Sequence, residues 1–158
     1  MNVSIICPLY NAEKYILNLD KSIKMQENVD IESISYILTK SGDRSEDILK
    51  KIEANYHVIE KKEFSHSLTR EKQATKSLGD IIVFVTQDVI IENKLWLYNL
   101  VRDIIDGKCE AGFSRQVCKY NGIEKYIRSK NYPDYSRIVS KEDIPKLGLI
   151  LFRCIVGG

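Results

Sequence analysis

Asp88 is the residue of this sequence whose setting best suits metal chemistry. It comes three residues after the apolar run of residues 81–85, where a carboxylate could face a cleft. Hard cations such as Mg²⁺ or Mn²⁺ prefer carboxylate oxygens combined with substrate phosphates, and one carboxylate suffices when a diphosphate supplies other ligands. Aspartate is also common in turns, so a purely structural role is the alternative interpretation of Asp88.

Other candidate residues follow the remaining predicted strands or lie in the connection into a predicted helix. Ligands of open α/β sheets bind outside the carboxyl ends of the strands, and this rule selects the candidates. They are Pro8, Tyr10 and Asn11 after the first strand, Ser41, Gly42 and Asp43 after the second, Thr86 and Gln87 beside Asp88, Arg115 and Gln116 after a later strand, and His66 and Arg70 in the connection into the third helix. Each candidate also has a structural interpretation, such as a strand end, a helix cap, a turn or a solvated side chain.

The elements that must position these residues alternate along the chain. Short runs rich in branched apolar residues predict strands, and apolar residues at helical spacing predict helices. We expect strands at 3–7, 35–39, 56–60, 81–85 and 110–118, and helices at 12–25, after residue 45, at 67–78 with Gly79 as its stop, and from the cap Asn93 to Gly107. This order predicts an α/β fold, an open and mostly parallel sheet with helices on both faces. The run at 81–85 is typical of a central strand, and residues 120–143 suggest a loop with one short helix.

Composition excludes several classes of protein. The chain has 158 residues, of which 44% are hydrophobic, and a net charge of +2, which gives no electrostatic reason to bind nucleic acid. No apolar run approaches the roughly 20 residues of a membrane-spanning helix, and the N-terminus lacks the features of a signal peptide. We therefore expect a cytoplasmic protein. The four cysteines form no C-x-x-C pair, so a thiolate zinc site is not expected.

Two common phosphate-binding signatures are missing. The sequence contains neither G-x-G-x-x-G nor G-x-x-x-x-G-K, which disfavours a dinucleotide dehydrogenase and a P-loop enzyme. A response-regulator-like module is also disfavoured, because no acidic pair follows the first strand.

Four segments, taken in order, resemble family-two glycosyltransferases of the rhamnosyltransferase-like kind. Residues 3–16 are similar to the family's opening, with its strand, proline, aromatic residue and asparagine. Residues 64–70 resemble an F-x-H-x-x-T-R segment, residues 84–88 a T-Q-D variant of the D-x-D motif, and residues 112–116 the segment after the next strand. The resemblance spans residues 3–148.

This resemblance implies a GT-A fold, a nucleoside-diphosphate sugar donor, Mg²⁺ or Mn²⁺ as cofactor, and inverting transfer of a sugar to a polysaccharide, glycan or lipid-linked acceptor. Rhamnose is the sugar it suggests, and the inner face of the membrane is a further location it allows. By the same analogy Pro8, Tyr10 and Asn11 line the nucleoside pocket, His66 and Arg70 face the diphosphate or sugar, and Asp88 holds the metal. Two departures stand out: Thr86 replaces the motif's first acidic residue, and Lys40 precedes Ser41 where the family has an aspartate.

The C-terminal part departs from the family pattern. We expect a donor-binding domain at 1–148, without its acceptor half, and an atypical apolar tail at 149–158. No residue qualifies as the general base, because Glu142 and Asp143 fit a polar turn before Pro145 better. A truncated product is one interpretation, and a non-catalytic remnant acting as a binding or scaffold module is the alternative function.

Overall fold

The computed structural model of the chain describes residues 1–114, 117, 121–123, 125–127, 135, 138 and 140. The chain divides into two units, Met1–Val101 and Arg102–Gly158, and each is described by itself. The predicted boundary at residue 148 lies outside the described residues and stays a prediction.

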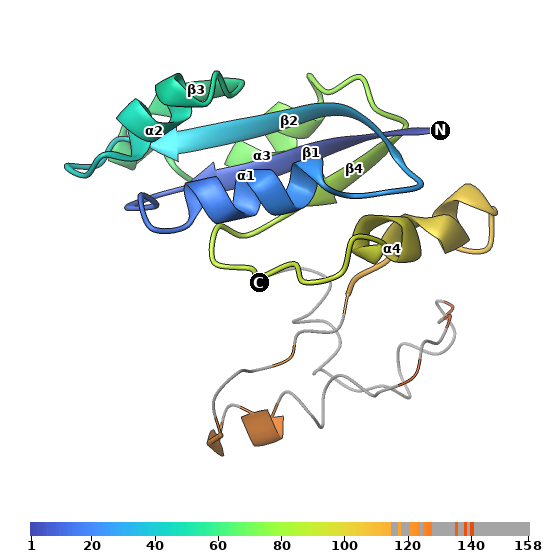
Figure 1. Ribbon diagram of the computed structural model, residues 1–158. Coiled ribbons are helices and arrows are strands. Elements are labelled where there is room, and N and C mark those ends of the chain that lie inside the picture. The colour runs from blue at the N-terminus through green and yellow to red at the C-terminus, as the bar shows by residue number, and fades with distance from the viewer. Residues whose placement is uncertain are drawn as a thin grey trace. The chain divides into compact units, whose positions relative to one another are not determined.

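The first unit contains a four-stranded sheet in which every pair of neighbouring strands is parallel (Figure 1). The strand order is β3-β2-β1-β4. The elements are β1 (Asn2–Leu9), α1 (Ile16–Lys24), β2 (Asp30–Thr39), α2 (Ser45–Lys51), β3 (Tyr56–Ile59), the 3₁₀ turn η1 (Lys61–Glu63), α3 (Leu68–Ala74), β4 (Ile81–Phe84) and α4 (Trp96–Ile105), whose last turn crosses into the second unit. The predicted open parallel α/β fold is confirmed.

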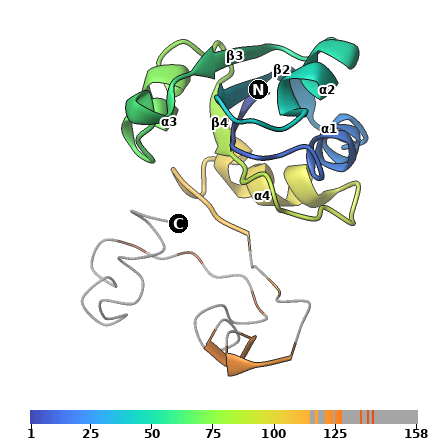
Figure 2. The same ribbon diagram turned by 90° about the vertical axis from the view of Figure 1, so that its left-hand side faces the viewer.

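Helices cover both faces of this sheet. Figure 2 shows α3 on one side of the strands, and α1 and α2 on the other. The chain runs outward from β1 through β2 to β3 and then returns to place β4 on the other side of β1. Because parallel crossovers are right-handed, this reversal moves the connecting helix to the opposite face. The strand order therefore switches between β1 and β4, which is where open α/β sheets bind ligands.

β1 forms the centre of the core. Its residues Val3, Ile5, Ile6 and Cys7 are completely buried, as expected for a strand that helices cover on both faces. From α1, Ile16, Leu19 and Ile23 are buried as well, so the apolar stripe predicted for that helix faces the sheet.

The prediction that residues 81–85 form a central strand is wrong for the described sheet. β4 pairs with β1 alone among the described strands, and so lies at the edge. Ile81 and Val83 are buried on one face, but the Phe84 side chain is 49% exposed. An apolar run of this kind shows that a segment is a strand, but it carries no information on which strands lie beside it.

Two predicted helix boundaries are also wrong. Asn11 does not cap α1, because the helix begins only at Ile16 and Asn11 adopts a left-handed backbone with φ of 49°, which asparagine tolerates better than most residues. Gly79 does not end α3, which stops at Ala74. A Cβ atom on Gly79 would lie 2.5 Å from the backbone nitrogen of Ser4, so the glycine permits a close approach to β1.

The start of α4 follows the prediction. Asn93 accepts a hydrogen bond from the backbone N–H of Leu95 through its side-chain oxygen at 2.8 Å, and from that of Trp96 through its carbonyl oxygen at 3.1 Å. After the helix, Gly107 has a positive φ of 69°, the backbone conformation in which glycine commonly ends a helix.

The predicted strand at 110–118 is not found where it can be checked, since residues 110–114 and 117 lie outside any strand and the others are not described. Residues 123 and 125–127 are helical, in agreement with the short helix predicted there. Within the described part of the chain, no helix has both the length and the apolar character needed to cross a membrane.

Candidate functional site

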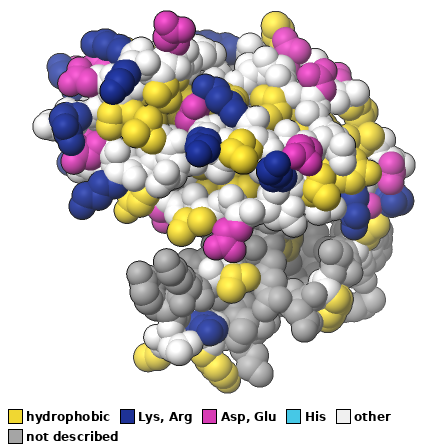
Figure 3. Space-filling model, viewed as in Figure 1, with side chains coloured by type: hydrophobic (Ala, Val, Ile, Leu, Met, Phe, Trp, Pro, Cys, Tyr) yellow, Lys and Arg dark blue, Asp and Glu magenta, His cyan; other side chains and the backbone are white. Residues whose placement is uncertain are grey.

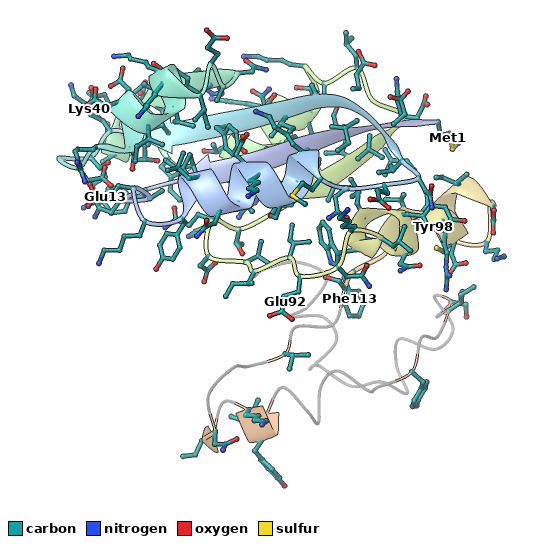
Figure 4. The ribbon with its side chains drawn as sticks, in the orientation of Figure 1. Met1, Glu13, Lys40, Glu92, Tyr98 and Phe113 are labelled. Carbon is teal, nitrogen blue, oxygen red and sulfur yellow. The ribbon has the colours of Figure 1, made fainter. Side chains whose placement is uncertain are left out.

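An open pocket of about 360 Å³ lies at the carboxyl ends of the strands. Figure 4 shows this end of the sheet, where Glu13 and Lys40 follow β1 and β2, opposite the end that carries Met1. The residues that line the pocket come from the ends of β1 and β2, from η1 and the turn after it, from α3 and from the segment after β4: Pro8, Leu9, Tyr10, Thr39, Lys61, Phe64, His66, Arg70, Thr86 and Gln87. The pocket therefore includes both sides of the β1/β4 switch point.

Tyr10 is held in place by the side chain of Gln87. The Gln87 side-chain oxygen accepts a hydrogen bond from the Tyr10 backbone N–H at 2.8 Å, and its Nε2 donates to the Tyr10 carbonyl at 3.0 Å. Tyr10 remains 41% exposed, and the Lys61 ammonium lies 5.4 Å from the centroid of its ring. An aromatic side chain on an anchored backbone at a pocket wall is suited to packing against a flat ring of a ligand.

The opposite wall of the pocket carries hydrogen-bond donors. Arg70 donates from Nη1 to the carbonyl oxygen of His66 at 2.8 Å, which leaves its other N–H groups available for a ligand. The His66 ring packs edge-on against Phe64, with centroids 5.0 Å apart. Lys61 and Arg70 are cations, and no aspartate or glutamate occurs among those lining residues that the structure describes. The pocket is therefore suited to an anion attached to an apolar or aromatic group.

Cys7, next to this pocket in β1, is a core thiol. Burial raises the pKa of Cys7 to about 12, the charge of Arg70 lowers that pKa and the charge of Asp88 raises it. At neutral pH this thiol is protonated and unreactive. Since both charges act on the same buried sulfur, Arg70 and Asp88 belong to the same end of the sheet.

Asp88 is exposed just beyond β4 and is not among the residues that line the pocket. No hydrogen bond or ion pair of Asp88 occurs within the described residues. The described part of the chain also has no group of three acidic, histidine or cysteine side chains that could hold a metal. Of the described residues, Asp88 alone is therefore a candidate ligand, and Mg²⁺ or Mn²⁺ accepts a single carboxylate when phosphate oxygens and water supply other ligands.

Asp43 joins two of the loops at this end of the sheet. Its carboxylate accepts hydrogen bonds from the hydroxyls of Ser41 at 2.6 Å and Ser45 at 2.7 Å, and from the backbone N–H groups of Glu13 at 3.1 Å and Ser45 at 3.3 Å. The Ser45 hydroxyl in turn accepts from the backbone N–H of Ala12 at 2.8 Å. Burial alone would raise the pKa of Asp43, but these hydrogen bonds outweigh it and lower the pKa below its ordinary value.

The structure thus brings together six of the residues selected from the sequence: Pro8, Tyr10, His66, Arg70, Thr86 and Gln87. Five others, Asn11, Ser41, Gly42, Asp43 and Asp88, lie outside the pocket lining, and Arg115 and Gln116 are outside the described residues, as are Glu142 and Asp143, which the sequence disfavoured as a general base. The sequence did not single out Thr39 and Lys61 as site residues, and Leu9 and Phe64 occur only within the segments of the family resemblance. The strand-end rule applied to β2 and β3 could have found Thr39 and Lys61, since each lies within two residues of a strand end.

A second pocket, of about 370 Å³, lies in the amino-terminal half of β2 and beside α1. Its buried carboxylate, Asp20, already accepts from the Tyr36 hydroxyl at 3.0 Å and pairs with Lys24 at 2.8 Å. Ligands of open α/β sheets bind at the other ends of the strands, so this hollow is not the candidate site.

Basic and acidic side chains are interspersed on the face of the molecule that Figure 3 displays. No large area of a single charge is visible on that face, in keeping with the net charge of +2. Attraction of an anionic ligand to the candidate site is therefore attributed to Lys61 and Arg70 in the pocket, and not to a broad basic surface.

Two curated proteins match most of the sequence. The O-antigen chain rhamnosyltransferase RfbN of Salmonella typhimurium is 33% identical over 157 residues, which cover 94% of this chain and 48% of RfbN. The O-antigen chain rhamnosyltransferase WbaN of Salmonella anatum is 31% identical over 149 residues, with 92% and 47% covered. The chain spans about half the length of these relatives.

Solved structures share the fold. A crystal structure of glucosyl-3-phosphoglycerate synthase from Mycobacterium tuberculosis, in complex with Mn²⁺, UDP-glucose and phosphoglyceric acid, has a TM-score of 0.56 and 21% identity, and covers 68% of this chain and 40% of that chain. For TarS 1–349 of S. aureus the TM-score is 0.52 and the identity 27%, with 67% and 33% covered. Both neighbours support the GT-A type of α/β fold.

The family profile gives the assignment. The profile described as glycosyl transferase family 2 matches residues 4–156, a range that includes the whole pocket and Asp88. This match shows that the chain belongs to glycosyl transferase family 2.

Proposed function

We propose that this chain is the nucleotide-sugar-binding part of an inverting glycosyltransferase that transfers rhamnose from a nucleoside-diphosphate donor to a polysaccharide, glycan or lipid-linked acceptor. The observation that carries the proposal is the pocket at the β1/β4 switch point, whose described lining combines an aromatic face with two cations and includes no acidic residue. The names of RfbN and WbaN support rhamnose and polysaccharide synthesis.

Within this proposal the two walls of the pocket take different parts of the donor. Pro8 and the ring of Tyr10 contact the nucleoside, with Asn11 at the edge of the pocket and Ser41 and Asp43 supporting Asn11 and its neighbours. The N–H groups of His66 and Arg70 donate hydrogen bonds to the diphosphate or the sugar. Thr86 and Gln87 form the wall of the pocket that follows β4. Charge-assisted hydrogen bonds from arginine to phosphate are strong and directional, which favours this orientation.

Asp88 is the proposed metal ligand, with Mg²⁺ or Mn²⁺ as the ion. When bound, the ion would stabilise negative charge on the departing diphosphate. The Mn²⁺ in the synthase complex supports a divalent metal in this kind of fold. Asp88 suits this role because its carboxylate is exposed and has no partner among the described residues.

The rest of the reaction needs groups that we do not assign to described residues. Inversion requires a carboxylate that removes the proton of the acceptor hydroxyl as it attacks, and no described residue is proposed for that role. The cytoplasm and the inner face of the membrane are the proposed locations, because the proposed donor is a soluble nucleotide.

Isothermal titration calorimetry with UDP, dTDP and GDP, each with and without Mn²⁺, tests the proposal directly. We expect at least one of them to bind, and Mn²⁺ to tighten its binding. Asp88→Asn should remove most of the Mn²⁺ effect, because an amide is a poorer ligand than a carboxylate. Glu92→Gln is the matched control, since this exposed carboxylate follows β4 in the same loop and does not line the pocket.

The titrations distinguish a failure of nucleotide binding from a failure of the metal assignment. Absence of heat with all three nucleotides in the presence of Mn²⁺ would refute donor binding. Binding that keeps its full Mn²⁺ dependence in Asp88→Asn would refute the metal assignment while leaving the nucleotide pocket intact. This test requires no turnover, so it applies to the chain as it stands.

A further inference from the structure

We propose that Lys61 is a donor-binding residue that contacts the diphosphate group from the wall of the pocket formed by η1. The inference rests on the proposed function, because it assumes that the pocket takes a nucleoside diphosphate. The motifs of the sequence do not single out Lys61, which stands in a polar turn between β3 and α3.

The first support is the position of the ammonium group. Lys61 lines the pocket together with Arg70 and Tyr10, and its Nζ lies 5.4 Å from the centroid of the Tyr10 ring. A contact of this kind at an exposed site is weak. A phosphate oxygen offers the same ammonium a stronger, charge-assisted hydrogen bond, and the flexible four-carbon stem of lysine allows it to reach one.

The second support is that neighbouring carboxylates are already engaged. Glu60 pairs with Lys40 at 3.1 Å, and the Glu63 carboxylate accepts the backbone N–H of Glu60 at 2.8 Å. The two glutamates form a reciprocal capping box around η1. No ion pair of the described residues involves Lys61, so its charge is left for a ligand.

The third support is the rigidity of the backbone that carries Lys61. The capping box fixes the start of η1, and the backbone N–H of Glu63 donates to the Glu60 carbonyl at 2.9 Å. The Lys61 main chain is thereby anchored at the pocket rim, and only its side chain has to move. Lys61 and Arg70 then offer two positive charges to a ligand group that carries at least two negative charges.

The matched pair of variants is Lys61→Gln and Lys62→Gln. Both lysines are exposed members of the same 3₁₀ turn, but Lys62 does not line the pocket. Each variant is titrated with whichever of UDP, dTDP and GDP the unmodified chain binds most tightly, in the presence of Mn²⁺, and then with the corresponding nucleoside. Circular dichroism and thermal melting verify that both variants keep the fold.

We expect Lys61→Gln to raise the Kd of the nucleoside diphosphate about tenfold, the effect of losing one charge-assisted hydrogen bond. Lys62→Gln should stay within about twofold, as is typical of an exposed charge. The nucleoside should bind both variants and the unmodified chain equally, and added salt should narrow the difference for the diphosphate.

Equal Kd values for the two variants with the diphosphate would overturn the inference. An equal loss for the nucleoside and the diphosphate would also overturn it, because Lys61 would then contact the base or ribose. Failure of the unmodified chain to bind any nucleoside diphosphate would instead refute the proposed function, and the inference with it.

Discussion

Asp43→Asn is the substitution that tests most directly how the loops at the carboxyl end of the sheet are held. The Asp43 carboxylate receives four hydrogen bonds, two at each oxygen. Asparagine has nearly the same shape, but it replaces one acceptor oxygen by an NH₂ donor. The hydroxyls of Ser41 and Ser45 can rotate to accept from that NH₂, whereas the backbone N–H of Glu13 or of Ser45 cannot.

The expected loss of stability in Asp43→Asn follows from the number of hydrogen bonds that change. One backbone N–H loses its partner, and the remaining contacts lose the assistance of a charge. A hydrogen bond to a charged group contributes roughly 1.5–3 kcal/mol, and the part-exposed setting of Asp43 argues for the lower end, so we expect a loss of about 1–2 kcal/mol in the free energy of unfolding. For a chain of this length that corresponds to a fall of about 3–6 °C in Tm.

The pH dependence provides an independent check. The pKa of Asp43 is lowered in the folded state from its ordinary value of 3.8. Above that ordinary value the carboxylate is ionised in both states and its full stabilisation is present, and the stabilisation is lost as the pH falls through the folded-state pKa. The stability difference between the unmodified chain and Asp43→Asn should therefore be constant from pH 5 to pH 7 and shrink below about pH 4.

Urea denaturation followed by circular dichroism measures both effects. Asp47→Asn is the control, since Asp47 is exposed on α2, four residues further along the chain. If Asp43→Asn were as stable as Asp47→Asn at pH 7, the interpretation of Asp43 as the connection between the two loops would be refuted. A difference that did not change with acid would show that the carboxylate acts by shape and not by charge.

Two further substitutions examine packing and a buried hydrogen bond. Gly79→Ala should lower the stability by about 1–3 kcal/mol, typical of overpacking, because the new Cβ would lie 2.5 Å from the Ser4 nitrogen; an unchanged thermal melt would contradict this. Tyr36→Phe should cost about 1–2 kcal/mol, since Asp20 loses a buried hydroxyl donor 3.0 Å away, and an unchanged urea midpoint would show that Lys24 alone satisfies that carboxylate.

Most elements of the fold could be predicted because their signals are local. The branched apolar residues of β1 and the helical stripe of α1 each occur within a few residues, so a short window contains the pattern. The place of β4 in the sheet is a different kind of property. It depends on which strands lie beside Ile81–Phe84, and the Ile/Val run has the same appearance at an edge as at the centre.

The candidate site was predictable to the extent that it follows strand ends. Tyr10 and Thr86 could be selected because each comes just after a predicted strand, and His66 and Arg70 because a resemblance covers their segment. Lys61 follows β3 by two residues, so the strand-end rule extended to β3 would have selected it. That this turn reaches the pocket depends on the pairing of β3 with β2, which joins residues 56–59 to residues 36–39 and lies outside any short sequence window.

The arrangement around Tyr10 explains how an exposed loop can serve as a binding surface. Gln87, from beyond β4, holds the Tyr10 backbone by two hydrogen bonds. Ser45, the first residue of α2, accepts from the backbone N–H of Ala12, and Asp43, from the β2–α2 connection, accepts from that of Glu13. The loop after β1 is thereby fixed from both neighbouring strands before any ligand arrives. Because ordering a flexible loop on binding costs free energy, a loop that is already ordered leaves more of the contact energy for affinity, while the long side chains of the opposite wall can still adjust to the ligand.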